Sequence, residues 1–257
     1  MFGMDSFQTY RDHARGNGVP EEAVDLALRL ARPQIELSSS AEGGGVLAGR
    51  YGGLPSLPAD IARKDHTDFI ASVDCAALPP DALDLPLPRD GQLLFFATRT
   101  DADGAVPADR AGSVVHVPAG AATTEREPEE EGAPSTEPRP LYARAVWSLP
   151  MSGDDAVLAD EEARRLYKEY ELEHLDRRRP VWEVDLLLGG YSCSPHDPVP
   201  MGSSGDDGKG GWVLLAQGQF PVHEDPDFTA CPFWIIRYDD LRAVDFGAAV
   251  LEMPTYH

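Results

Sequence analysis

The sequence predicts an α+β fold in which two related β-rich halves form one compact unit of 257 residues. Three observations support this class. Helix-period patterns occur at the N-terminus and in the middle of the chain, whereas apolar runs of strand length fill the remainder. A Gly-Gly pair beside an aromatic residue occurs in each half, in RYGGLP at 50–55 and in LGGY at 188–191. The strand sequences that follow the two pairs match in order.

Two short helices are expected before the first half. Asp5 or Ser6 can cap the first helix, which ends at Gly16. The second begins at Pro20, a residue that suits the first helical position, and is ended by Pro33.

The first half, about 34–120, contains segments with the length and apolar content of strands. They are QIELSSS (34–40), DFIASVDCAAL (68–78), GQLLFFATR (91–99) and GSVVHVPAG (112–120). Between the second and third of these lies a turn-rich connection, PPDALDLPLPRD.

Between the halves the composition changes twice. Residues 121–140 are rich in Glu and Pro and contain no aromatic residue, which is typical of a solvated acidic loop without a packed core. LYARAVWSLP (141–150) returns to strand character. Residues 155–177 are expected to form a long connecting helix, in which Glu161 and Arg165 are an i,i+4 pair.

The second half, about 181–250, repeats the pattern of the first. Its strand candidates are LLLGGYS (186–192), GWVLLAQGQF (211–220) and CPFWIIRYDDL (231–241). FIASVD of the first half matches VLLAQGQ of the second, with Ala71 over Ala216, and LLFFAT matches PFWIIR. The shared order favours an internal duplication over a chance match of short apolar motifs.

Charge and cysteine usage limit the classes of partner. The chain has 44 acidic and 22 basic residues, for a net charge of −22. Such a surface repels phosphate backbones and anionic lipids, so we expect neither a nucleic-acid nor a membrane partner, and any protein partner should be basic. No apolar run reaches the length of a membrane helix, and the N-terminus lacks a signal-peptide pattern. Three cysteines are too few for a disulfide framework and indicate a cytoplasmic location.

The densest polar cluster is GGYSCSPHDP at 189–198. Cys193 and His196 could act as a nucleophile and its base, but such pairs are usually assembled by the fold rather than by a three-residue spacing. Pairs such as His196-Asp197 could contribute to a metal site, yet no metal-binding spacing is present. We therefore expect a turn here, and predict no catalytic residue, metal or cofactor.

The two Gly-Gly pairs lack the patterns of phosphate-binding loops. We interpret them as structural turns with positive φ, which form part of a repeated β module and of the floor of a cleft. The turn glycines are Gly52, Gly53, Gly189 and Gly190. The candidates for lining a ligand cleft are Arg50, Tyr191, His196 and Gln217.

These residues resemble the YwqG-like family, a bacterial domain family of unknown function. The resemblance is based on RPQIEL, Arg50-Tyr51-Gly52-Gly53-Leu54-Pro55, the GQLLFF strand, LGGY and the C-terminal DL…DF element, and it covers about residues 20–250. It implies an α+β fold with two β-rich halves and no established chemistry. One departure is Ser72, which stands where the family usually has Gln; Gln217 keeps that residue in the second half.

The sequence thus favours a non-enzymatic cytosolic binding or interaction protein. The alternative is a small-ligand-binding protein or an enzyme with a cleft near the second Gly-Gly segment. A deep pocket with converging polar groups would favour the alternative, and a flat exposed patch would favour the first interpretation.

Overall fold

The computed structural model describes residues 4–41, 44–61, 67–98, 114–127, 136–151, 158, 160–175, 184–193, 210–218, 220–222 and 225–252. Its strands are β1 (Arg32–Ser38), β2 (Val46–Tyr51), β3 (Ser56–Pro58), β4 (Thr67–Asp74), β5 (Gln92–Thr98), β6 (Val114–Val117), β7 (Thr123–Glu125), β8 (Arg139–Ser148), β9 (Leu186–Gly189), β10 (Trp212–Gly218), β11 (Phe220–Val222), β12 (Asp225–Ala230), β13 (Phe233–Arg237) and β14 (Val250–Glu252). The helices are α1 (Met4–Gly16), α2 (Glu21–Leu30), α3 (Glu161–Glu169) and α4 (Tyr238–Arg242), with 3-10 turns η1 (Cys75–Ala77), η2 (Leu172–Leu175) and η4 (Phe246–Ala248).

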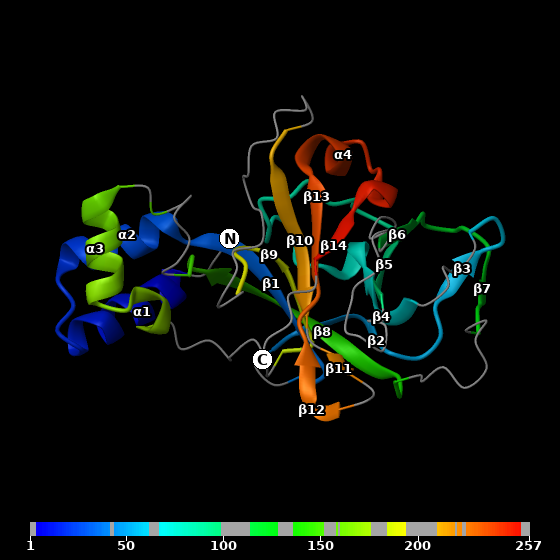
Figure 1. Cartoon of the computed structure of the whole chain (residues 1–257), viewed down its shortest axis with the longest axis horizontal. Coiled ribbons are helices and arrows are strands. Elements are labelled where there is room, and N and C mark those ends of the chain that lie inside the picture. The colour runs from blue at the N-terminus through cyan, green and yellow to red at the C-terminus, as the bar shows by residue number, and fades with distance from the viewer. Residues whose placement is uncertain are drawn as a thin grey trace.

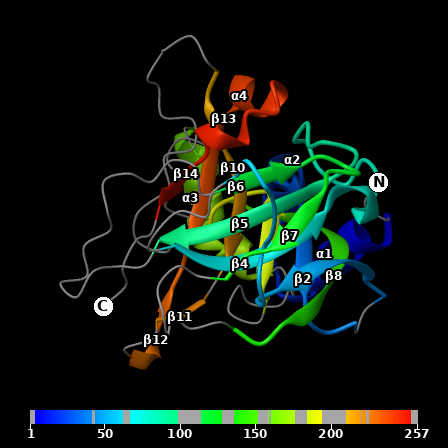
Figure 2. The same ribbon diagram turned by 90° about the vertical axis from the view of Figure 1, so that its right-hand side faces the viewer.

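Ten of the strands form one antiparallel sheet, in the order β14-β13-β10-β9-β1-β8-β2-β4-β5-β6 (Figures 1 and 2). The sheet curls until its two sides meet. The rings of Phe95 on β5 and Trp234 on β13 are 5.2 Å apart, and the Trp234 Nε1–H donates to the Phe96 carbonyl oxygen over 2.9 Å. The main hydrophobic core fills the space enclosed by this curl.

The order of the sheet is the same when it is followed outward from either side of its central pair, β1 and β8. On one side lie β9, β10, β13 and β14, the second strand set; on the other lie β2, β4, β5 and β6, the first strand set. The registers also correspond. Tyr51, just before the first Gly-Gly pair, is opposite Ala71, and Leu188, two residues before Gly190, is opposite Ala216.

A β-bulge occupies the same place in both strand sets. The β4–β5 register shifts between Phe69 and Ala71, and the β10–β13 register shifts between Leu214 and Ala216. A bulge turns the strand and strengthens its twist, so the two bulges help each set to curl toward the other. The outer face of each set carries its own small apolar cluster, one around Phe69 and one around Leu214.

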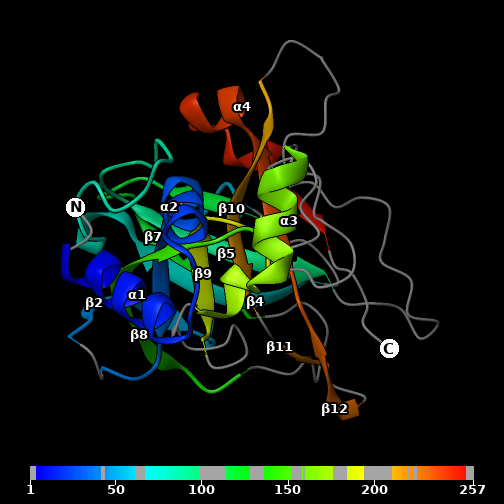
Figure 3. The same ribbon diagram turned by 90° about the vertical axis from the view of Figure 1, so that its left-hand side faces the viewer.

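The helices α1, α2 and α3 form a separate cluster at one end of the central strands (Figures 1 and 3). This cluster packs around Trp147 of β8, whose ring is 5.4 Å from that of Phe7 and 5.3 Å from that of Tyr10. The Asp160 side chain caps α3 by accepting from the Ala163 N–H over 2.8 Å.

The connecting helix is shorter than the expected 155–177. α3 ends at Glu169, and Glu171 has a φ of +45°, which is incompatible with a continuing helix and leads into the 3-10 turn η2. Within the expected acidic loop at 121–140, the exposed strand β7 pairs with β3, whereas residues 128–135 lie outside the described ranges.

None of the helices in the described ranges is both long enough and apolar enough to cross a membrane. The three cysteines, Cys75, Cys193 and Cys231, are free thiols.

Candidate ligand-binding cavity

Each Gly-Gly pair turns the chain where it leaves a strand, β2 or β9. All four glycines have positive φ, as expected from the sequence: Gly52 +68°, Gly53 +77°, Gly189 +64° and Gly190 +73°. Space is also short at these turns. A Cβ on Gly52 would lie 2.7 Å from the Thr136 carbonyl oxygen, and one on Gly190 would lie 2.4 Å from Ser148 Oγ. Gly52 and Gly190 therefore require glycine for both conformation and close approach.

Gln217 holds the chain that follows the second pair. Its side chain is only 1% exposed. Its Nε2 donates to the Tyr191 carbonyl oxygen over 2.8 Å, and its Oε1 accepts from the Cys193 N–H over 2.9 Å. Tyr191 is also buried, and its hydroxyl donates to the Leu30 carbonyl oxygen over 2.8 Å. These polar groups of both candidate cleft residues are thus bonded inside the protein.

Arg50 holds the chain that follows the first pair. Its Nη2 donates to the Leu54 carbonyl oxygen over 2.5 Å. Arg50 belongs to β2, three strands from β9 in the sheet, so the structure brings Gln217 and Tyr191 together but places Arg50 elsewhere. His196, the fourth candidate, lies outside the described residues.

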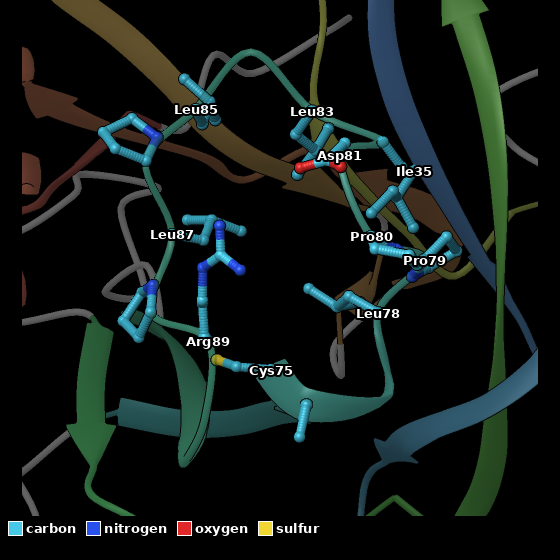
Figure 4. Close-up of a pocket in the computed structure, with 14 residues that line it drawn as sticks. Ile35, Cys75, Leu78, Pro79, Pro80, Asp81, Leu83, Leu85, Leu87 and Arg89 are labelled. Carbon is cyan, nitrogen blue, oxygen red and sulfur yellow. The ribbon is translucent and has the colours of Figure 1, made fainter. Parts of the chain in front are cut away.

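A cavity lies under the loop that joins β4 to β5 (Figure 4). Its volume is about 480 Å³, within the range typical of small-molecule sites. The side chains around it come mainly from the loop, with Ile35 contributed by β1. The apolar lining includes Ile35, Leu78, Leu83, Leu85 and Leu87, and the prolines 79, 80, 86 and 88.

The second Gly-Gly pair supports this loop. A Cβ on Gly189 would lie 3.0 Å from Leu83 Cδ2 and 3.4 Å from Leu85 Cδ1, so these two leucines pack directly on the glycine. An ion pair fastens the same loop to β1: Arg32 Nη2 and Nε lie 2.9 and 3.0 Å from Asp84 Oδ2. The loop is therefore anchored at its middle, and the cavity beside it is preformed.

Two charged side chains line the cavity, Arg89 and Asp81. Figure 4 shows the Arg89 guanidinium reaching toward the centre of the loop beside Leu87, with Asp81 on the opposite side. Among the described residues, Arg89 has no hydrogen-bond or ion-pair partner. Arg89 is an exposed residue, and an exposed cation at the side of a leucine- and proline-lined cavity can orient an anionic ligand.

Cys75 is the one thiol among the residues that line the cavity. Its side chain is 5% exposed, and burial, together with the charges of Asp74 and Asp90, raises its pKa to about 12. The thiol is neutral at pH 7 and so is a poor nucleophile. In the part of the chain that the structure describes, no group of three or more His, Cys, Asp and Glu residues could hold a metal ion.

The sequence of PPDALDLPLPRD predicts a turn-rich connection and does not by itself indicate a cavity. The available signal was the alternation of leucines with prolines and aspartates. A solvated turn has no need of leucines at Leu83, Leu85 and Leu87, and all three belong to or pack against the main core.

Comparison with known families supplies one match. A family model described as a domain of unknown function, DUF1963, matches residues 49–254. The chain belongs to the DUF1963 family. The matched range takes in all strands from the end of β2 onward, but not α1, α2 or the central strand β1. A search among curated proteins gave no match to this DUF1963 chain.

Proposed function

We propose that this chain is a non-enzymatic binding protein whose ligand is a small apolar molecule ending in an anionic group. The observation that supports the proposal is the preformed cavity of about 480 Å³, which combines a leucine- and proline-rich lining with the unpaired cation of Arg89. The site suits a medium-chain carboxylate. Burial of its methylene groups supplies most of the affinity, at about 0.8 kcal/mol for each group that is fully removed from water.

The negative charge of the protein restricts where an anionic ligand can bind. With a net charge of −22, the surface as a whole repels anions. Local attraction at Arg89 has to overcome this repulsion, so an anion is bound only where its apolar part is buried and its charge meets the guanidinium. The Cys75 thiol does not supply a nucleophile for chemistry on the ligand, because burial keeps it neutral at pH 7.

Titration calorimetry with octanoate tests the proposal, with octylammonium as the oppositely charged control. We expect saturable binding of octanoate and weaker binding of octylammonium. Arg89→Gln should weaken octanoate binding about fivefold, as expected for one partly solvated ion pair. Arg29→Gln removes the same charge from an exposed site on α2 and should leave binding unchanged.

A second variant tests the location. Ala76 is exposed and lines the cavity, so Ala76→Phe should obstruct the cavity and reduce octanoate binding at least tenfold without disturbing the sheet. If Ala76→Phe binds octanoate as tightly as the wild-type protein does, the ligand binds outside this cavity. If neither octanoate nor octylammonium binds, the proposed ligand class is wrong.

We also infer that the two strand sets arose by duplication and that the chain is a YwqG-like member of its family. The mirrored sheet order, the matching registers beside the Gly-Gly pairs and the repeated bulge support the duplication. A superposition of the two strand sets in a crystal structure tests it: one rotation should place β4 and β5 on β10 and β13 with Ala71 on Ala216. A one-residue offset between the two bulges would contradict it.

For location and partners, we propose a cytoplasmic bacterial protein, with any protein partner being basic. The three free thiols and the net charge of −22 support this proposal. Affinity for a basic partner should fall steeply as salt is raised from 50 to about 300 mM, because screening shortens the reach of surface charge. A salt-independent partner would contradict the electrostatic part of the proposal.

A further inference from the structure

A second, more polar pocket lies on the outer face of the first strand set. Its volume is about 400 Å³, and its polar lining consists of Arg50, Ser56, Ser72, Asp74 and Gln92. It does not share any residue with the cavity under the 75–89 loop. In the second strand set the residue at the register position of Ser72 is Gln217, whose side chain is buried.

The correspondence follows from the strand registers. Ser72 is directly opposite Arg50, and Gln217 is directly opposite Leu187. Each of these pairs is adjacent to a pair that contains an alanine, Ala71 in the first strand set and Ala216 in the second, and these two alanines have matching registers. Serine is two bonds shorter than glutamine and cannot fill the space or reach the following loop. The pocket is therefore lined by Ser72 at the register position where the second strand set has the longer Gln217.

One backbone donor lacks the acceptor that its counterpart has. Cys193, three residues after Gly190, donates its N–H to Gln217 Oε1. Ser56 stands three residues after Gly53. The Arg126 N–H donates to the Pro55 carbonyl oxygen over 3.0 Å, which makes that pair the hydrogen-bonded one and leaves Ser56, the next residue, in a non-hydrogen-bonded pair with Glu125. The Ser56 amide is thus not used by β7, and Ser56 is one of the residues that line the polar pocket.

The pocket also contains both signs of charge. Arg50 gives one hydrogen bond to Leu54 and has Glu125 at 3.8 Å, which leaves donors of its guanidinium available. Asp74 uses Oδ1 to accept from the Ala76 N–H, and its other oxygen remains available. Among the described residues, the Ser72 and Gln92 side chains have no hydrogen-bond partner.

We propose that this pocket binds a small zwitterion, an amino acid with its carboxylate at the Ser56 amide and Arg50 and its ammonium group at Asp74. The carboxylate oxygen takes the place of Gln217 Oε1 in the other strand set. A zwitterion has no net charge, so the acidic surface does not repel it. An isolated anion or cation satisfies only one end of the pocket and leaves the other charge without a partner.

Calorimetric titration with glycine, β-alanine, γ-aminobutyrate and 5-aminovalerate tests the proposal and measures the spacing of the two charges. Saturable binding with one preferred chain length is the expected result. Butyrate and butylamine, each with one charge, should bind at least tenfold more weakly than the preferred zwitterion. Equal binding of butyrate would show an anion site and overturn the proposal, as would failure of every zwitterion to bind.

Variants locate the site. Ser72→Gln introduces the residue that the second strand set accommodates, so it should abolish zwitterion binding while the protein stays folded. Thr123→Gln, on exposed β7, is the matched control and should bind normally. Asp74→Asn keeps the capping oxygen and should remove the advantage of the zwitterion over butyrate. If Ser72→Gln binds the zwitterion as tightly as the wild-type protein does, the assignment is wrong. Octanoate should not compete with the zwitterion for this pocket.

Discussion

The loops after the two Gly-Gly pairs show how one backbone requirement is met by two side chains. In each loop the residue that follows the pair, Leu54 or Tyr191, has its carbonyl oxygen bonded to a side chain of the neighbouring strands. Gln217 of β10 does this in one loop, and Arg50 of β2 does it in the other. Of the two corresponding cross-strand pairs, Arg50–Ser72 and Leu187–Gln217, the bonding side chain is on β2 in the first and on β10 in the second. The fold requires a bonded carbonyl there, and not a particular residue.

The two solutions differ in burial. Gln217 is almost completely buried and makes two bonds to the backbone, so no water can replace it. The Arg50 side chain is 34% exposed and makes one such bond, so water can take over part of its role. The second loop should therefore be rigid and intolerant of substitution. The first should tolerate change and leave polar groups for a ligand.

Alanine at the second glycine of each pair gives the largest contrast. A Cβ on Gly190 would lie 2.4 Å from Ser148 Oγ and 2.6 Å from Gln34 Nε2, two groups that bond the adjacent backbone. One on Gly53 would meet nothing closer than Pro138 Cβ at 3.2 Å. We expect Gly190→Ala to cost about 4 kcal/mol and Gly53→Ala about 1–2 kcal/mol, because both adopt positive φ but only the first also clashes.

Urea unfolding followed by far-UV circular dichroism measures both free energies. Gly16→Ala serves as a control for the general effect of adding a methyl group, since Gly16 is the last residue of α1 and a Cβ there meets nothing within 4 Å. Similar losses for Gly190→Ala and Gly53→Ala would show that φ alone sets the cost and that the two turns are equally constrained.

The next largest loss of stability is expected when Gln217 or Arg50, the side chains that bond the loop carbonyl oxygens, is replaced. Gln217→Leu leaves the Cys193 N–H and the Tyr191 carbonyl oxygen buried without partners, which should cost about 3 kcal/mol. Arg50→Leu should cost about 1 kcal/mol, since the Leu54 carbonyl oxygen can be reached by water. Unfolding free energies in urea give both values. A larger loss for Arg50→Leu would reverse the proposed difference between the loops.

Much of the architecture could be predicted from sequence, because apolar runs and glycines report local requirements. The runs around Phe95 and Trp234 indicated buried strands, and Gly52 and Gly189 indicated turns with positive φ. The sequence could not show that β1 lies beside β9 of the distant set, since pairing partners in an antiparallel sheet are set by the whole fold.

The site was less predictable, because the same side chain can bond a ligand or the protein itself. Gln217 and Tyr191 are polar residues near a turn, which is typical of a ligand site, but the fold uses both to hold backbone groups. The cavity residues Leu83 and Arg89 carried no motif. Their role depends on the packing of the loop against Gly189, which is a contact over about a hundred residues of sequence.

The double variant Arg50→Leu with Ser72→Gln tests whether a glutamine at position 72 can replace Arg50 in holding the loop. It recreates in the first strand set the leucine–glutamine pair formed by Leu187 and Gln217. Ser72→Gln should recover most of the stability lost through Arg50→Leu, with a coupling free energy of about 1 kcal/mol in a double-mutant cycle. Arg50→Leu with Thr123→Gln is the matched control. Additive effects in the cycle would show that the introduced amide does not reach the loop.

The smallest effect concerns thiol chemistry and leaves the native stability at neutral pH unchanged. Burial raises the pKa of Cys75 to about 12 from the usual 9.0, and it also raises the pKa of Cys231, with a further contribution from Cys193. A raised pKa lowers the thiolate fraction, by about tenfold for each pKa unit at pH 8. Cys75 of the first strand set should therefore react with iodoacetamide far more slowly than the half-exposed Cys193 beside the second. Peptide mass spectrometry after timed labelling distinguishes the three sites. Since the unfolded thiol ionises near pH 9 and the folded one only near 12, stability from Cys75 is intact below pH 9 and is lost as the pH rises toward 12. Rapid labelling of Cys75 in the folded protein would show a reactive thiol in the cavity, and with it the chemistry that a pure binding site does not need.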